Sequence, residues 1–161
     1  MTGIAIGCAI NRCPVIMTHQ RLDFSLLAFD QIVNNAAKIF YMFNGQFTVP
    51  ITLRLIVGKG WGQGPTHAQS LQSLFAHIPG LKVVMPSNPN DAKKMLIQSI
   101  EDPNPVIYIE HRWLHDQKGH IEKSFNSKKI GKANLLMKGN DITIVSNSFM
   151  TTEALIAAKI L

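Results

Sequence analysis

The residues best suited to chemistry lie in a glycine-rich stretch, residues 58–67, which reads Gly-Lys-Gly-Trp-Gly-Gln-Gly-Pro-Thr-His. Glycine tolerates positive φ and is costly inside helices and strands, so this composition predicts a loop. An apolar run at residues 50–57 predicts a strand before the loop, and residues 68–77 predict a helix after it. Ligands of open α/β sheets bind where strands end. We therefore expect the loop to approach a ligand closely.

The histidine of this loop, His67, is the candidate catalytic residue. A neutral imidazole near a bound ligand can donate to a developing anion or move a proton near pH 7. The alternative interpretation is a flexible surface connection whose histidine is incidental. The local sequence does not name a substrate.

Other reaction classes find less support. His111 and His115 have a spacing that places two zinc ligands on one helical face, but no HExxH-type carboxylate motif accompanies them. No GxSxG elbow is present, and Ser70 and Ser73 are expected to be helix residues rather than nucleophiles. The glycine loop also lacks the spacing of a Walker loop or of a dinucleotide-binding GxGxxG.

Composition indicates a folded protein with a real core. Apolar residues make up 46% of the 161 residues, and no apolar run is long enough to cross a bilayer. Cys8 and Cys13 fit no metal or CxxC pattern and are expected to be reduced thiols. The net charge of +6 is not patterned for nucleic acid, since its lysines cluster modestly at 118–132 with few aromatics. The apolar start resembles the interior of a longer chain.

The elements that must position the loop alternate between strands and helices. Residues 2–11 predict a short buried helix, and residues 14–18 a short buried strand. A long helix is expected up to about residue 43, capped by Asp23 or Ser25 and stopped by Gly45. Its predicted apolar face consists of Leu26, Phe29, Val33, Ala36, Ala37 and Phe40.

After the loop, residues 81–86 predict a third strand and residues 106–110 a fourth. Between them, Asn88 predicts a helix cap with Pro89 in the first turn. This order predicts an α/β fold, a mainly parallel sheet with helices on both faces.

The character of the chain changes after His111. Residues 112–129 are polar and basic, residues 131–137 predict an isolated strand, and residues 141–145 and 151–161 predict a strand and a helix. Such a pair cannot bury its apolar faces alone. We therefore divide the chain into a main domain at 1–111, a linker with a connecting strand at 112–138, and the first βα unit of a C-terminal domain at 139–161.

Most of the chain resembles the beta subunit of thiamine-diphosphate-dependent 2-oxo acid dehydrogenases of the pyruvate dehydrogenase type. The resemblance runs from Thr2 to about Ser148. Its matching segments are residues 2–7, 23–25, 30–32, 36–38, 41–42, 45–46, 49–51, 64–67, 69–70, 79–84, 91–93, 104–106, 130–133 and 141–145.

The resemblance implies a transketolase-like pyrimidine-binding domain. It implies that Phe24 stacks on the aminopyrimidine ring of thiamine diphosphate and that His67 serves the later acyl transfer. An alpha subunit would hold the diphosphate and Mg²⁺ through a GDG-type motif that is absent here. A structural K⁺ would be bound by backbone carbonyls, and Pro103 departs from the family pattern there. The carbonyls would be those of Ile51, Ser99, Ile100, Asp102 and Asn104.

The implied reaction is oxidative decarboxylation of a 2-oxo acid with acyl transfer to lipoamide. The implied partners are an alpha subunit, a second beta subunit in a heterotetramer and an acyltransferase core, in the cytoplasm or the mitochondrial matrix. The family's catalytic glutamate would lie just upstream of Met1, so the chain alone is expected to have little activity. Two alternatives stay open: a fragment of a 1-deoxyxylulose-phosphate synthase or transketolase-like enzyme, and a non-catalytic interface module.

Overall fold

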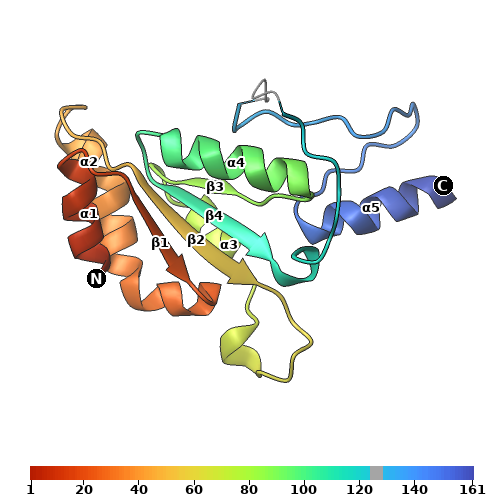
Figure 1. Ribbon diagram of the computed structural model, residues 1–161, viewed down its shortest axis with the longest axis horizontal. Coiled ribbons are helices and arrows are strands. Elements are labelled where there is room, and N and C mark those ends of the chain that lie inside the picture. The colour runs from red at the N-terminus through yellow and green to blue at the C-terminus, as the bar shows by residue number, and fades with distance from the viewer. Residues whose placement is uncertain (124–128) are drawn as a thin grey trace.

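The computed structural model describes residues 1–123 and 129–161. Within these residues the chain alternates between helical and extended elements (Figure 1). The elements are α1 (Thr2–Ile10), β1 (Val15–His19), the 3₁₀ helix η1 (Leu22–Ala28), the π-helical η2 (Gln31–Ala36), α2 (Ala37–Met42), β2 (Ile51–Val57), η3 (Pro65–His67), α3 (Gln72–Ala76), β3 (Lys82–Val84), α4 (Pro89–Glu101), β4 (Val106–His111), η4 (Arg112–Leu114) and α5 (Phe149–Ile160).

The four described strands form one sheet in the order β1-β2-β4-β3. All three pairings are parallel, with Val15 opposite Ile51 and Thr52 opposite Val106. Parallel pairing places every strand's carboxyl end at the same edge of the sheet. The predicted α/β fold with a parallel sheet is therefore confirmed.

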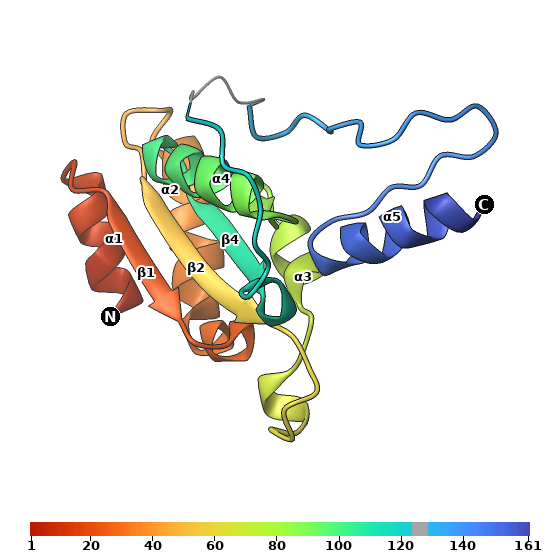
Figure 2. The same ribbon diagram turned by 45° about the vertical axis from the view of Figure 1, so that its right-hand side comes forward.

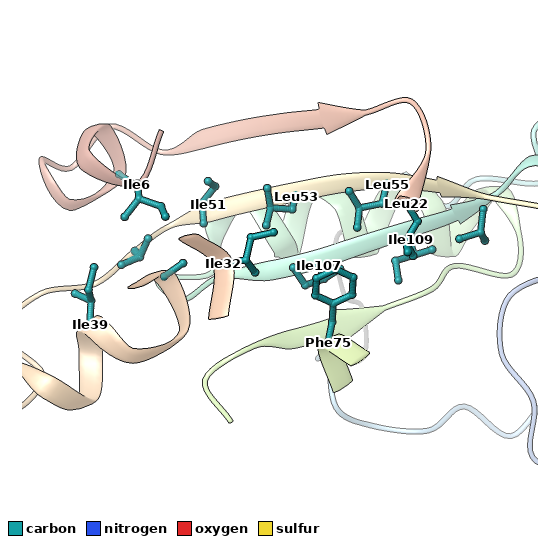
Figure 3. Close-up of a cluster of buried hydrophobic side chains, with 14 residues drawn as sticks. Ile6, Leu22, Ile32, Ile39, Ile51, Leu53, Leu55, Phe75, Ile107 and Ile109 are labelled. Atoms are coloured by element: carbon teal, nitrogen blue, oxygen red, sulfur yellow. The ribbon is translucent and has the colours of Figure 1, made fainter. Parts of the chain in front are cut away.

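Alternate residues of the strands face opposite sides of the sheet, and each side has its own core. Leu53, Leu55 and Ile107 point to the side covered by α1, the η1–α2 region and α3, where Ile32 and Phe75 pack against them (Figure 3). Val106 and Tyr108 point to the other side, against Met95 and Leu96 of α4. Figure 2 shows α4 and α2 on opposite sides of the sheet.

The start of α4 and the turn before β3 follow from single residues. The Asn88 side chain accepts a hydrogen bond from the Asp91 backbone N–H at 2.9 Å, and Pro89 occupies the first turn, as predicted. Gly80 has a φ of +100°, and a Cβ there would lie 2.0 Å from the Ala37 carbonyl oxygen. Only glycine allows this turn to pack so closely against α2.

The predicted long helix is wrong in its form and in part of its buried face. It divides into η1, η2 and α2, and neither Asp23 nor Ser25 caps it, since the residue before η1 is Arg21 and makes no side-chain cap. Gly45 does follow the end of α2 with a positive φ. The predicted face is right in part, since Ala36 and Ala37 are buried and Phe29 packs against the core. Leu26 and Phe40 are instead 40% and 48% exposed, and Leu22, Ile32 and Ile39 are also buried.

Three further elements are less buried or shorter than predicted. The first helix is not buried all round, because Ile4 of α1 is 74% exposed. β1 is an edge strand, so Ile16 on its α4 side is half exposed. The helix predicted at 68–77 forms only as α3, preceded by η3.

The carboxyl-terminal part lies to one side of the sheet, with an extended segment leading into α5 (Figure 1). The predicted helix is confirmed as α5, but neither 131–137 nor 141–145 is a strand. A strand needs a hydrogen-bonded neighbour, and no described segment pairs with residues 141–145. Ile142 and Val145 are 71% and 91% exposed. The division at residues 111 and 138 stays a prediction.

Among the described helices, none has the length and apolar character needed to cross a membrane.

Candidate functional site

The segments that follow β1, β2 and β4 meet at the carboxyl edge of the sheet. There they line an open cavity of about 400 Å³. Its lining residues are Gln20, Arg21, Phe24, Ile56, Gln63, His67 and Arg112. The glycine loop projects from the carboxyl end of β2 at this edge (Figure 1). The cavity lies within the size range of small-molecule sites, at the sheet edge where such sites form.

Phe24 and His67 contact each other in this cavity. Their ring centroids lie 5.1 Å apart with an interplanar angle of 85°, an edge-to-face pair. Phe24 comes from η1 and is 38% exposed, so its ring is open to a ligand on the cavity side. The sequence predicted both residues as site residues, and the structure brings them together.

The end of the glycine loop sets the position of His67. Gly64 has a φ of +73°, Pro65 begins η3, and His67 ends it. The Thr66 hydroxyl and His67 Nδ1 lie 3.0 Å apart. If Thr66 engages Nδ1, the other ring nitrogen, Nε2, is left to face a ligand. The loop composition that predicted this site is required by its positive φ angles.

Asp23 connects η1 to the segment after η3. Its Oδ1 accepts hydrogen bonds from the Gln69 backbone N–H at 3.3 Å and from Gln69 Nε2 at 2.8 Å. Asp23 is buried, so these bonds take the place of water. Ser25 donates to the Leu22 carbonyl oxygen. Asp23, which the sequence suggested as a helix cap, instead fixes the two segments that carry Phe24 and His67.

The sequence analysis missed the two arginines of the cavity, Arg21 and Arg112. Gln63 Oε1 accepts from Arg21 Nε at 3.1 Å and from Arg21 Nη2 at 2.7 Å, and the guanidinium lies 5.4 Å from the Trp61 ring centroid. Arg21 and Arg112 come just after β1 and β4. Ligands of open α/β sheets bind where strands end. Applying this rule to the ends of β1 and β4, as well as to β2, would have identified both arginines.

A second cavity, of about 440 Å³, lies on the α4 side of the same edge. Its walls include Arg54 and Glu110, which form an ion pair at 2.7 Å, and His115, whose Nε2 lies 3.8 Å from Glu110 Oε2. Burial, and secondarily the nearby His115, lowers the pKa of His111. This favours a neutral His111 in the folded protein.

The predicted histidine pair is not arranged as zinc ligands on one helical face. His111 ends β4 and accepts a hydrogen bond from the Trp113 N–H, while His115 Nδ1 lies 3.1 Å from Arg112. Within residues 1–123 and 129–161, no cluster of three or more His, Cys, Asp or Glu side chains could hold a metal ion.

The predicted K⁺ ligands lie at the end of α4 and the start of β2. The Thr52 hydroxyl donates to the Ser99 carbonyl oxygen at 2.9 Å, so these two regions are adjacent. Asp102 Oδ1 accepts from the Asn104 N–H, and Asp102 Oδ2 pairs with Lys82. The carbonyls of the last helical turn lack intrahelical partners, which suits them to a cation. The Lys82 ammonium already supplies one positive charge to this turn.

The fold and the cavity define an α/β domain with a cavity of small-molecule size at a parallel sheet edge. Residues 1–117 match the family model described as transketolase, pyrimidine binding domain. The chain belongs to this family. A solved structure described as a split gene transketolase, inactive beta4 tetramer, superposes with a TM-score of 0.77 over 98% of this chain and 48% of that one. At 22% identity, that likeness shows the fold alone.

Curated relatives agree with the resemblance to dehydrogenase beta subunits. The beta subunit of acetoin:2,6-dichlorophenolindophenol oxidoreductase from Cupriavidus necator is 43% identical over 99% of this chain and 47% of its own length. The mitochondrial pyruvate dehydrogenase E1 component subunit beta-2 of Oryza sativa subsp. japonica is 39% identical over 99% of this chain and 44% of its own. The predicted resemblance is confirmed, and the chain spans about half the length of these relatives.

Proposed function

We propose that this chain supplies the aminopyrimidine half of a thiamine diphosphate site in the beta subunit of a 2-oxo acid dehydrogenase. The observation that carries the proposal is the pairing of Phe24 with His67 in one ligand-sized cavity. The family match and the dehydrogenase relatives support it. The partner, an alpha subunit, supplies Mg²⁺ and the groups that hold the diphosphate.

The exposed ring of Phe24 fits an aromatic ligand, because a flat apolar face against an aminopyrimidine excludes water and fixes the ring plane. Thiamine diphosphate, when bound, would supply a nucleophilic carbon for the decarboxylation of a 2-oxo acid and the transfer of its acyl group. His67 then acts at Nε2, by donating to the oxygen that gains charge during acyl transfer. Thr66, close to Nδ1, holds the imidazole in position for this role.

Cofactor binding tests the proposal directly. The protein that contains this chain is assembled with an alpha-type subunit, and thiamine diphosphate is titrated by calorimetry. Phe24→Ala is expected to weaken binding by about tenfold, the size expected for an aromatic contact. Phe40→Ala is the matched control, since Phe40 is similarly exposed but belongs to α2, outside the cavity. Equal affinities of the two variants would contradict the proposal.

His67 is tested separately from cofactor binding. His67→Asn is expected to keep the affinity for thiamine diphosphate and to lose at least tenfold in acyl transfer to lipoamide, because the amide cannot move a proton. Transfer at the wild-type rate would remove His67 from the reaction. An assembled complex that binds the cofactor but never turns over would favour the interface module. Exposed apolar residues such as Ile4 and Tyr41 support that second candidate.

The K⁺ site belongs to the same proposal. Its support is the position of the proposed carbonyl ligands. Ser99 and Ile100 lie in the last turn of α4, and Asp102 and Asn104 follow in the next turn. Ile51 is brought close to them by the hydrogen bond between Thr52 and Ser99. Thermal unfolding in KCl and in NaCl of equal concentration tests it. A Tm that is the same in both salts contradicts the site.

The remaining parts of the proposal concern the rest of the assembly. A second beta subunit and an acyltransferase core complete the complex, in the cytoplasm or in the mitochondrial matrix of a eukaryote. Residues 112–138 act as a linker, and residues 139–161 begin a further domain. The exposed Ile142 and Val145 support this division, since a strand that packs in a domain would bury them. Size measurement of the assembled complex tests the subunit composition.

A further inference from the structure

The cavity that holds Phe24 and His67 has an unbalanced charge. Two of its seven lining residues are arginines, and none is a carboxylate. Among the described residues, neither Arg21 nor Arg112 is in an ion pair, because the described pairs are Arg54–Glu110, Lys82–Asp102, Lys94–Glu122 and His115–Glu110. A cleft with one sign of charge concentrates ligands of the opposite sign.

The acidic residues nearest in sequence to the cavity are already engaged. Asp23, two residues after Arg21, accepts both hydrogen bonds from Gln69. Glu110, two residues before Arg112, pairs with Arg54. The hydrogen bonds of Asp23 and the ion pair of Glu110 direct these carboxylates to other partners, so the charge of the two guanidinium groups stays available to a ligand.

Arg21 is held in place without being neutralised. Gln63 accepts from two of its nitrogens, the Gln20 carbonyl oxygen accepts from Nη1 at 2.9 Å, and Trp61 lies against the guanidinium. These neutral partners leave the full charge but remove rotamer freedom before a ligand arrives. Preorganisation of this kind increases affinity, since less ordering is needed on binding. Gln63 and Trp61 belong to the glycine loop, which therefore also positions Arg21.

Arg112 comes to the same cavity from the end of β4. Its Nη1 lies 3.1 Å from His115 Nδ1, a ring nitrogen rather than a carboxylate oxygen. A Cβ at Gly58 would lie 3.3 Å from the Arg112 Cβ, so the loop backbone packs directly against this residue. The loop thus contacts both arginines of the cavity, one through side chains and the other through its backbone.

We propose that Arg21 and Arg112 recognise a negatively charged group on the substrate, so that the site selects an anion over a neutral acyloin. This inference rests on the proposed function and decides between the substrates named in two of its relatives, since pyruvate is an anion and acetoin is neutral. The recognised chemistry is a carboxylate or a phosphate, which a guanidinium binds through paired hydrogen bonds.

Kinetics on the assembled enzyme test the proposal, with pyruvate as the substrate and thiamine diphosphate saturating. Arg21→Gln and Arg112→Gln are each expected to raise KM for pyruvate about tenfold, with a smaller change in kcat. Turnover of acetoin is expected not to fall. Arg12→Gln is the control, because it removes the same charge at the end of α1, outside the cavity. An unchanged KM for pyruvate in both cavity variants would overturn the proposal.

Cofactor affinity separates this inference from the proposed function. If Arg21→Gln and Arg112→Gln weaken thiamine diphosphate binding and leave KM for pyruvate unchanged, the arginines serve the cofactor and the inference is wrong. If wild-type protein fails to bind the cofactor, the proposed function fails, and anion binding is still measured without it.

That second measurement uses tryptophan fluorescence, since Trp61 contacts Arg21. Pyruvate or inorganic phosphate is expected to change the emission saturably, and Arg21→Gln to abolish the change. The two titrations distinguish a carboxylate site from a phosphate site. Acetoin is expected to have no effect. A response to acetoin equal to that of pyruvate, or a response retained in Arg21→Gln, would overturn the proposal.

Discussion

Asp23 and Gln69 join the two segments that carry the site. One carboxylate oxygen of Asp23 accepts from both the backbone and the side-chain amide of Gln69, at 3.3 and 2.8 Å. Phe24 follows Asp23 directly, and His67 lies two residues before Gln69. The distance between the two candidate site residues therefore depends on this part-buried contact.

Asp23→Ala is expected to lower the free energy of unfolding by about 1–3 kcal/mol, because it removes two hydrogen bonds that a buried carboxylate accepts. Urea unfolding followed by circular dichroism measures the loss. Asp30→Ala serves as the control, since Asp30 also accepts two amide hydrogen bonds but is exposed. Its expected cost is below about 0.5 kcal/mol. Similar losses of unfolding free energy in both variants would show that the Asp23–Gln69 contact stabilises the fold no more than an exposed hydrogen bond does.

Gly80→Ala is expected to be one of the most destabilising single-methyl changes in this chain. The residue combines a φ of +100° with an ideal Cβ position 2.0 Å from the Ala37 carbonyl oxygen, which is backbone and cannot rotate away. Gly131→Ala is a matched control, because its φ is +95° and nothing lies within 4 Å of its Cβ position. We expect the control to lower the free energy of unfolding by about 1 kcal/mol, from φ strain alone, and Gly80→Ala to lower it by more.

Thermal unfolding of the two glycine variants gives the comparison. Because the φ angles are nearly equal, the difference in Tm reports the clash with Ala37. Equal Tm values would mean that the turn moves away from α2 without cost.

These residues also show how far the sequence alone could go. β2, the glycine loop and the Asn88 cap were predictable because each depends on local chemistry: an apolar run, positive φ and a side-chain acceptor. Asp23 was misassigned because a helix cap and a long-range acceptor look the same in sequence. The contact with Gln69 exists only after the fold brings η1 beside η3.

Other features depend on neighbours that the sequence does not specify locally. Arg21 and Arg112 were missed because the strand-end rule was applied to β2 alone, and their shared cavity depends on a strand order that no local pattern gives. The strand predicted at residues 141–145 fails because alternation of side chains does not make a strand without a partner. Part of the buried face of the η1–α2 region was misplaced because 3₁₀ and π-helical turns change the period of the helix.

Stability is expected to fall as the pH drops below about 6.5. Burial lowers the pKa of His19, and burial together with His115 lowers the pKa of His111. With a lower pKa in the folded state, the unfolded chain binds protons more readily, so stability rises with pH through this range. Tm measured at pH 7.5 and at 5.5 should show the decrease.

The histidine variants assign this pH dependence. His111→Gln and His19→Gln together should reduce the difference in Tm between the two pH values, since neither glutamine titrates. The same difference in wild type and in the double variant would mean that other groups carry it.

The attachment of α5 depends on one aromatic side chain. Phe149 stacks on His111, with centroids 5.0 Å apart, and meets Trp113 edge to face at 4.9 Å. Only Thr151 of α5 is buried, so Phe149 supplies much of the contact between this helix and the end of β4. Each aromatic contact contributes about 0.5–1.5 kcal/mol beyond the area that it buries.

Phe149→Ala is therefore expected to speed amide hydrogen exchange throughout α5 by at least tenfold and to leave exchange in β2 and β4 unchanged. Met150→Ala is the control, because Met150 is 60% exposed on the same helical turn. Exchange in α5 that is equally slow in both variants would mean that contacts other than the aromatic cluster hold the helix.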